Sequence, residues 1–194
     1  GARPRRFIAL VGDAELDEGN VWEALLDESL SGLSNVLWIV DLNRQTLDRV
    51  VPGIRVSRLR KLFAEIGWRV LEVKYGRRLQ AAFARPGGAA LRRRIDDMSN
   101  EQYQALIRLP GAELRQQLCA VETKNDAQDI EQALAEVSDA DLPGVIADLG
   151  GHDLEELLAA LNEFDQHPDR PTVLFAYTIK GWRLPFAGHP LNHS

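Results

Sequence analysis

The sequence predicts an α/β protein built on a doubly wound, mainly parallel sheet with flanking helices. Four short apolar runs are spaced along the chain, and three of them are almost continuously apolar. Such runs are typical of strands that are covered on both faces, as in a parallel sheet. Amphipathic helical patterns separate the runs, and an alternation of strand and helix indicates right-handed βαβ units.

The expected strands lie in both halves of the chain, at residues 6–12, 35–42, 68–74 and 172–179. Between the first two, residues 17–32 carry apolar side chains at helical spacing, and Gly32 is the candidate C-terminal cap. A second helical pattern covers residues 56–67, with Ser57 as the candidate N-terminal cap. These two helices complete the strand–helix–strand–helix–strand order of the first half.

The second half begins with residues 77–149, which carry only helical signals and predict a helical insertion. The last helix is expected over residues 150–167, with Asp153 as its N-cap. Its apolar stripe is expected to consist of Leu154, Leu157, Leu158 and Leu161. Residues 1–194 are expected to form one domain. The chain starts at Gly1, and its last residues close no element, so we expect it to be excised from a longer chain.

Composition narrows the class of protein. The chain has 194 residues, 45% of them hydrophobic, which suffices for one core. The net charge of −6 argues against a nucleic-acid-binding surface. The single cysteine, Cys119, excludes an internal disulfide and is expected to be a buried structural thiol in a reducing cytoplasm. No apolar run suggests a membrane span or a signal peptide.

Polar residues follow three of the expected strands. The first strand is followed by Asp13 and Glu15, the second ends in Asp41, Asn43 and Gln45, and the last ends in Thr178, Lys180 and Gly181. In open α/β sheets, ligands bind beyond the carboxyl ends of the strands. We therefore expect a ligand site at this edge of the sheet.

Asp13 and Asn43 are thirty positions apart with one helix between them, so they are expected on neighbouring strand ends. A carboxylate oxygen, an amide oxygen and a main-chain carbonyl suit an octahedral Mg²⁺, which takes further ligands from phosphates. A helix starting near Asp17 and the charge of Lys180 would favour a diphosphate. The alternative is structural, with Asp13 capping a turn and Asn43 stabilising a loop.

A longer stretch, "GDAELDEGNVWEALLDESLSGLSNVLWIVDLNRQTLD" (residues 12–48), resembles the thiamin-diphosphate motif of transketolase-like enzymes. That motif begins Gly-Asp-Gly and ends at an Asn near the tip of the next strand. Three shorter stretches, "NRQTLD", "LGGHD" and "TIKGW", favour the homodimeric pyruvate dehydrogenase E1 component over transketolase itself. The resemblance implies a truncated thiamin-diphosphate-binding fold, namely a fragment of the diphosphate-binding (PP-type) domain.

The resemblance also implies roles for residues. Asp13 and Asn43 would bind Mg²⁺ through their side chains, with the main-chain oxygen of Gln45 as the third ligand. The residues implied to lie against the diphosphate are Gly12, Asp13, Ala14, Glu15, Asn43 and Lys180. Residues 181–194 would form a mobile active-site loop that carries a catalytic histidine, with His193 as the best match and His189 as its competitor. His152 is interpreted as a helix-start residue rather than a catalyst.

Three residues depart from the family pattern. Ala14 stands where the family usually has Gly, and a methyl group there would either crowd the diphosphate or be tolerated at negative φ. Asp41 stands where Asn is common, which adds negative charge near a diphosphate. Arg183 stands where Gly is more frequent, which would stiffen the loop.

The implied activity is that of a thiamin-diphosphate- and Mg²⁺-dependent 2-oxoacid dehydrogenase, with pyruvate as the expected substrate. Such an oxidoreductase decarboxylates the oxoacid and transfers the acyl group to a lipoyl-bearing acyltransferase component. The family's catalytic glutamate and substrate-binding histidines have no match in this chain. The isolated chain is therefore expected to be inactive and to need the remaining domains and a second subunit, as a homodimer. The alternatives are a transketolase-type ketol transferase fragment and a non-catalytic fragment that only assembles with a partner chain.

Overall fold

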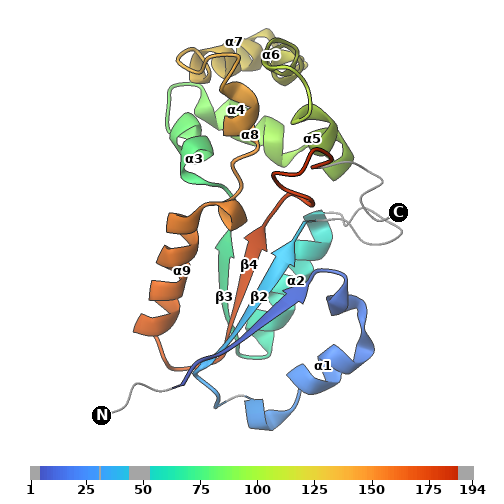
Figure 1. Ribbon diagram of the computed structural model, residues 1–194, viewed down its shortest axis with the longest axis vertical. Helices are drawn as coiled ribbons and strands as arrows, with labels where there is room; N and C mark the ends of the chain where they lie inside the picture. Colours follow the sequence, from blue (N-terminus) through green and yellow to red (C-terminus); the bar gives the residue numbers. More distant parts are fainter. Residues whose placement is uncertain (1–4, 31, 44–52, 188–194) are drawn as a thin grey trace. The chain divides into compact units, whose positions relative to one another are not determined.

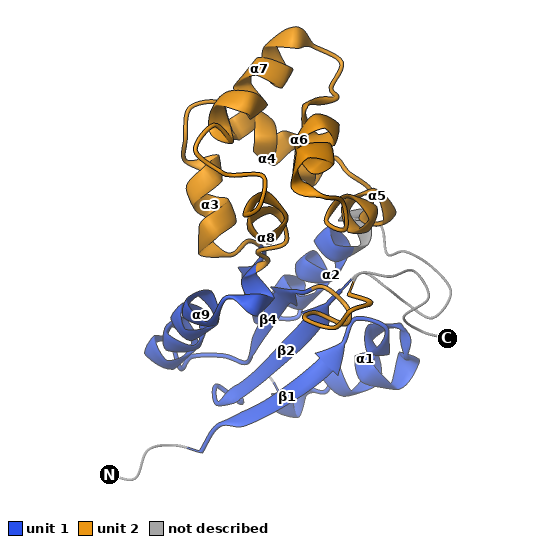
Figure 2. Cartoon of the chain, turned by 45° about the horizontal axis from the view of Figure 1, so that its top comes forward, with its two compact units in different colours: residues 1–74, 150–178 blue, residues 75–149, 179–194 orange. Residues whose placement is uncertain are grey.

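The computed structural model describes residues 5–30, 32–43 and 53–187. The chain divides into two compact units (Figure 2). We call them the sheet unit, residues 1–74 and 150–178, and the helical unit, residues 75–149 and 179–194. Each unit is described by itself.

The described part of the sheet unit contains a sheet of four strands in the order β1-β2-β4-β3 (Figure 1). The strands are β1 (Phe7–Gly12), β2 (Val36–Leu42), β3 (Arg69–Val73) and β4 (Thr172–Tyr177). Every neighbouring pair is parallel. The predicted α/β class with a parallel sheet is confirmed, and each strand lies within one residue or two of its expected bounds.

Helices cover both faces of this sheet. The elements that follow β1 and β2 are η1 (Glu15–Asp17), α1 (Gly19–Leu25), η2 (Glu28–Leu30) and α2 (Gly53–Glu65). Side chains of η1, α1 and α2 share one apolar cluster with Val11, Val40 and Phe175 of the sheet. On the other face, α9 (Leu154–Gln166) packs Ala160 and Phe164 against Leu37, Leu71 and Leu174. The sheet is therefore doubly wound, as predicted.

Phe63 of α2 forms the centre of the first apolar cluster. Its side chain is fully buried, and its ring lies 5.6–6.4 Å, centroid to centroid, from those of Trp22, Trp38, Trp68 and Phe175. Most of these rings meet edge to face, an arrangement that adds attraction beyond the burial of apolar area. Phe63 therefore links α1, β2, the start of β3 and β4 through one side chain.

The helix expected over residues 17–32 is wrong in its second half. The α-helix ends at Leu25, and Leu26, expected on the apolar face, is 66% exposed. A carboxylate oxygen of Asp27 accepts a hydrogen bond of 2.9 Å from the main-chain nitrogen of Ser29. Such local side-chain bonds offer the backbone an alternative to the helix, so a 3₁₀ turn replaces the last turns.

Two other helix predictions need correction. Ser57 does not cap α2, because that helix starts at Gly53 and Ser57 lies within it. In α9, Asp153 is the N-cap as predicted, and its carboxylate accepts from the main-chain nitrogen of Glu155 at 3.0 Å. Leu157 and Leu161 of the expected stripe pack against the sheet with Ala160 and Phe164, as predicted. Leu154 and Leu158 do not, and they are 69% and 53% exposed.

The helical unit contains α3 (Arg77–Phe83), α4 (Gly88–Asp96), α5 (Asn100–Leu106), α6 (Gly111–Cys119), α7 (Lys124–Ala133) and α8 (Leu142–Ile146). Ser99 and Gln102 form a capping box at the start of α5. Arg115 of α6 donates to the main-chain oxygens of Leu134 and Val137 and to the carboxylate of Asp139. These bonds tie the segment after α7 to α6.

Among the helices of the described residues, none combines the length and the apolar character needed to cross a membrane.

Candidate functional site

The candidate site of the sheet unit begins where β1 and β2 end together. Gly12 pairs with Asp41 in the parallel ladder, and the main-chain nitrogen of Asp13 donates to the main-chain oxygen of Asp41 at 3.2 Å. The pairing therefore continues one residue past β1. Asp13 is only 5% exposed, so its carboxylate is held in a largely enclosed place at this edge.

A tight turn follows Asp13. Ala14 has φ −70° and ψ −28°, and its main-chain oxygen accepts from the nitrogen of Asp17 at 3.1 Å. This conformation is open to any L-residue, so the methyl group in place of the family's Gly causes no backbone strain. The Glu15 carboxylate accepts from the main-chain nitrogen of Gly12 at 3.0 Å, which turns that side chain back toward the end of β1.

The end of β2 is tied to the end of β4 through side chains. The hydroxyl of Thr178 donates to one carboxylate oxygen of Asp41. The other carboxylate oxygen accepts from the amide nitrogen of Asn43 at 3.5 Å. The main-chain nitrogen of Thr178 also donates to the oxygen of Leu42 at 3.2 Å. The sequence placed Asp41, Asn43 and Thr178 at one edge, but it gave no sign that Asp41 would join the other two.

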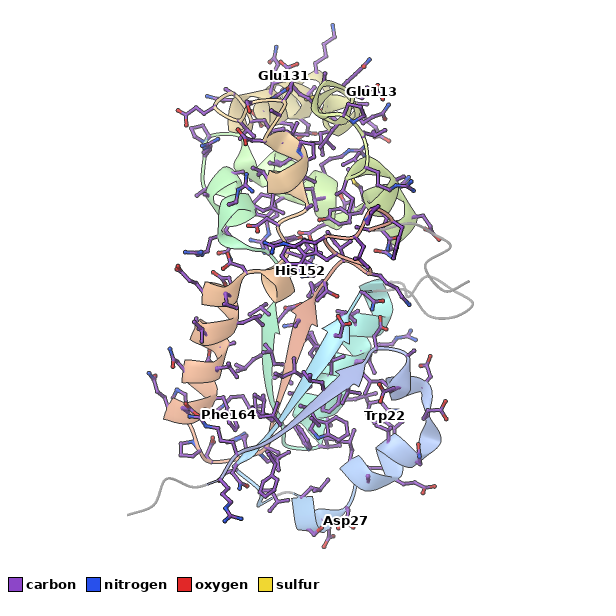
Figure 3. The ribbon with its side chains drawn as sticks, in the orientation of Figure 1. Trp22, Asp27, Glu113, Glu131, His152 and Phe164 are labelled. Carbon is purple, nitrogen blue, oxygen red and sulfur yellow. The ribbon has the colours of Figure 1, made fainter. Side chains whose placement is uncertain are left out.

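The "LGGHD" stretch lies across the ends of β3 and β4. The main-chain nitrogen of Gly150 donates to the oxygen of Lys74 at 3.1 Å. A Cβ atom on Gly151 would lie only 2.5 Å from the main-chain oxygen of Tyr177 and 2.7 Å from the methyl of Thr178. The two glycines therefore allow a close approach of backbones, which sequence reasoning missed. His152 lies in η3 (Gly150–His152), just before the N-cap of α9 (Figure 3).

The segment after Thr178 belongs to the helical unit. It contains Lys180, whose contact with a diphosphate stays a prediction. Arg183 has φ +64°, a left-handed conformation that glycine adopts without cost and other residues rarely adopt. The Gly that the resemblance implies at this position would adopt this conformation without strain. The guanidinium of Arg183 lies 4.3 Å from the centre of the Trp182 ring, a stacking contact that offsets part of the strain.

Three predicted site residues, Gln45, His189 and His193, lie outside the described residues. Within the described ranges, no group of three or more His, Cys, Asp or Glu side chains is placed to hold a metal ion. The predicted magnesium set is of another kind, since Asp13 is its only carboxylate and the other two ligands are an amide oxygen and a main-chain oxygen.

The residues present fit such a metal. Asp13 is an enclosed carboxylate at the carboxyl end of β1, and Asn43 follows the neighbouring strand β2. The atom of the Asn43 amide that faces Asp41 is the nitrogen, and the amide oxygen is the atom that would ligate a metal. Hard oxygen donors from two adjacent strand ends are the type of ligand that Mg²⁺ prefers.

Comparison with known proteins found relatives over nearly the whole chain. It is 28% identical over 193 residues to the pyruvate dehydrogenase E1 component of Cupriavidus necator, covering 98% of this chain and 21% of that protein. It is 30% identical over 189 residues to that of Corynebacterium glutamicum and 25% identical over 186 residues to that of Escherichia coli. In each case it spans about a fifth of the relative's length.

No protein-family model matches the chain. Among solved structures, a transketolase from Pichia stipitis aligns with 96% of this chain and 17% of its own, at 16% identity and a TM-score of 0.46. We rely on the sequence relatives, because all three are named pyruvate dehydrogenase E1 component and each matches more than nine-tenths of this chain. They confirm that the chain resembles, over almost its whole length, a segment of about one fifth of the pyruvate dehydrogenase E1 component.

Proposed function

We propose that this chain is the diphosphate- and metal-binding segment of a thiamin-diphosphate- and Mg²⁺-dependent 2-oxoacid dehydrogenase E1, with pyruvate as its substrate. The observation that carries the proposal is the joined end of β1 and β2, where an enclosed Asp13 and the Asn43 amide lie at adjacent strand ends. The E1 names of the relatives supply the enzyme class. The oxoacid is decarboxylated, and the acyl group passes to a lipoyl-bearing acyltransferase component.

Different residues of this chain would bind the metal and the diphosphate. The Asp13 carboxylate, the Asn43 amide oxygen and the main-chain oxygen of Gln45 would hold the metal. Gly12, Ala14, Glu15 and Lys180 would lie against the diphosphate, as the family resemblance implies. When bound, thiamin diphosphate supplies the carbanion chemistry of decarboxylation.

We assign proton transfer to residues outside the sheet unit. His193 is the proposed catalytic histidine of the loop, and His189 is its competitor. The glutamate that activates the cofactor comes from the remaining domains or from a second subunit of the homodimer. The isolated chain is therefore inactive on a 2-oxoacid, although it contains the metal-binding half of the site.

Thermal unfolding tests the proposal. Melting is followed without ligand, with Mg²⁺, with thiamin diphosphate and with both. A ligand at a hundredfold excess over its dissociation constant stabilises the folded state by about 2.7 kcal/mol, or roughly 5–10 °C for a chain of this size. We expect this rise only with both ligands, and we expect it to be lost in Asp13→Asn.

The matched control is Glu18→Gln. Glu18 is exposed, and although it is the N-cap residue of α1, its side chain makes no capping hydrogen bond. It should keep the full rise. A rise that does not need Mg²⁺, or one that Asp13→Asn retains, would refute the metal assignment. The absence of any rise would refute a preformed half-site in this chain.

A further inference from the structure

We propose that Asp41 is a positioning residue that fixes the orientation of the Asn43 amide, so that the amide oxygen is presented to the metal. The inference rests on the proposed function and extends it to a residue that departs from the family pattern. It assigns to Asp41 a task separate from direct contact with metal or diphosphate.

The first step is the geometry of the Asp41 carboxylate. One oxygen accepts from the Thr178 hydroxyl, and the other accepts from the Asn43 amide nitrogen at 3.5 Å. Thr178 is itself fixed, because its main-chain nitrogen donates to the oxygen of Leu42 at 3.2 Å where β2 and β4 end side by side. The carboxylate is therefore held by the residue that follows β4, while its other oxygen faces Asn43.

The second step is the chemistry of donors and acceptors. An ionised carboxylate only accepts hydrogen bonds, whereas an amide has one donating and one accepting end. Only the nitrogen of Asn43 can therefore face Asp41. Nitrogen and oxygen lie on opposite sides of the amide carbon, so this contact turns the oxygen away from Asp41. A hard cation requires that oxygen, and the flipped amide would present a nitrogen that cannot ligate it.

A carboxylate at position 41 fixes the orientation of Asn43 more strictly than the Asn that the resemblance implies there. An Asn side chain can offer either its oxygen or its nitrogen, so two neighbouring amides can flip together. A carboxylate removes this second arrangement. The negative charge of Asp41 opposes diphosphate binding, but Asp41 is solvent-exposed and water screens its charge. The contact with Asp41 orients only the Asn43 amide, whereas the negative charge of Asp41 affects any nearby ion.

A double-mutant cycle separates these effects. Asp41→Ala is made in the full chain and again in an Asn43→Asp background, where both oxygens of the new side chain are equivalent and need no orientation. Mn²⁺ binding is measured by electron paramagnetic resonance in the presence of thiamin diphosphate. Residues that orient metal ligands typically change metal affinity 10- to 100-fold. We expect the loss from Asp41→Ala to be about tenfold larger with Asn43 than with Asp at position 43.

Thr178→Val and Thr178→Ser form a second, charge-neutral arm. Valine keeps the branched shape but removes the hydroxyl that anchors Asp41, and serine keeps the hydroxyl. We expect weaker Mn²⁺ binding for Thr178→Val and near-normal binding for Thr178→Ser. If Asp41→Ala does not fold, these two variants still test the contact between Thr178 and Asp41.

The outcomes are distinct. An equal loss in both backgrounds would mean that Asp41 contributes charge or local stability only, and it would overturn the inference. Unchanged binding in Asp41→Ala and in Thr178→Val would overturn it as well. If the unmodified chain binds no Mn²⁺ with thiamin diphosphate, the proposed function itself fails, and the inference falls with it. A larger loss with Asn43, together with weaker Mn²⁺ binding in the charge-neutral Thr178→Val, supports both the inference and the proposed function.

Discussion

The main-chain nitrogen of Asp13 donates a hydrogen bond of 3.2 Å to the main-chain oxygen of Asp41. This bond lies beyond the last residue of β1, so the backbone itself keeps the two strand ends together. Asp41 is two residues before Asn43, and Asp13 is 5% exposed. The backbones that carry Asp13 and Asp41 are therefore held side by side by the sheet before any ligand binds, which reduces the cost of ordering this part of the proposed site.

Ala14→Gly should not improve the site. Because Ala14 has φ −70°, its methyl group causes no backbone strain, and glycine only adds freedom to the unfolded chain. We expect an unchanged affinity for thiamin diphosphate and a free energy of unfolding lower by about 0.5–1 kcal/mol. Calorimetric titration and urea unfolding measure the two quantities. A tenfold gain in affinity would show instead that the methyl group crowds the diphosphate.

Phe63→Ala should be among the most destabilising single changes in the sheet unit. The side chain is fully buried among four aromatic rings, and its removal leaves a cavity that they cannot fill. We expect a loss of about 3–5 kcal/mol in the free energy of unfolding, measured in urea. Leu62→Ala is the matched control, because Leu62 is the preceding residue and is 49% exposed. Similar losses for the two variants would contradict the packing described here.

Gly151→Ala should disturb the ends of the strands. The added methyl group would lie 2.5 Å from the main-chain oxygen of Tyr177, so the turn or β4 must shift. Overpacking of this kind costs about 1–3 kcal/mol. Gly19→Ala, where the methyl group meets nothing within 4 Å, should be neutral or slightly stabilising. The difference between their urea midpoints checks the prediction, and equal midpoints would show that the turn does not press on β4.

Cys119 should react slowly in the folded chain. Burial raises the pKa of its thiol above the usual range, and the nearby Glu131 carboxylate raises it further, against a smaller opposing effect of Arg115. The thiolate is the reactive form, so less of it is present at neutral pH than in the unfolded chain. We expect iodoacetamide to label the folded chain more slowly than the urea-unfolded chain at pH 8, as followed by mass spectrometry. Equal rates would show that the fold does not suppress formation of the thiolate.

The sheet could be predicted because its signal is local. The run that forms β4 is almost continuously apolar, and every residue of that strand is buried, as expected of a parallel strand covered on both faces. The same pattern in β1 predicted the strand but not its cover, because β1 is an edge strand in which Phe7, Ile8 and Leu10 are exposed. The N-cap role of Asp153 could also be predicted from a local signal. The end of α1 could not be predicted in this way. It depends on whether the main-chain nitrogen of Ser29 donates to the Asp27 carboxylate or to a main-chain oxygen of the helix.

The site was predictable only in part. The carboxyl ends of neighbouring parallel strands must meet, so Asp13 and Asn43 could be placed at one edge. The link from Thr178 to Asp41 joins residues 137 positions apart and depends on β4 lying next to β2. A strand order of β1-β2-β4-β3 is a property of the whole sheet, and no local pattern in the sequence specifies it.

A calorimetric titration of the chain with thiamin diphosphate, in Mg²⁺ and again in EDTA, tests the proposed site most directly. We expect saturable binding in Mg²⁺, none in EDTA, and none in Mg²⁺ for Asp13→Asn. Binding of equal strength in Mg²⁺ and EDTA, or undiminished binding by Asp13→Asn, would contradict the claim that the joined ends of β1 and β2 form a metal-dependent diphosphate site.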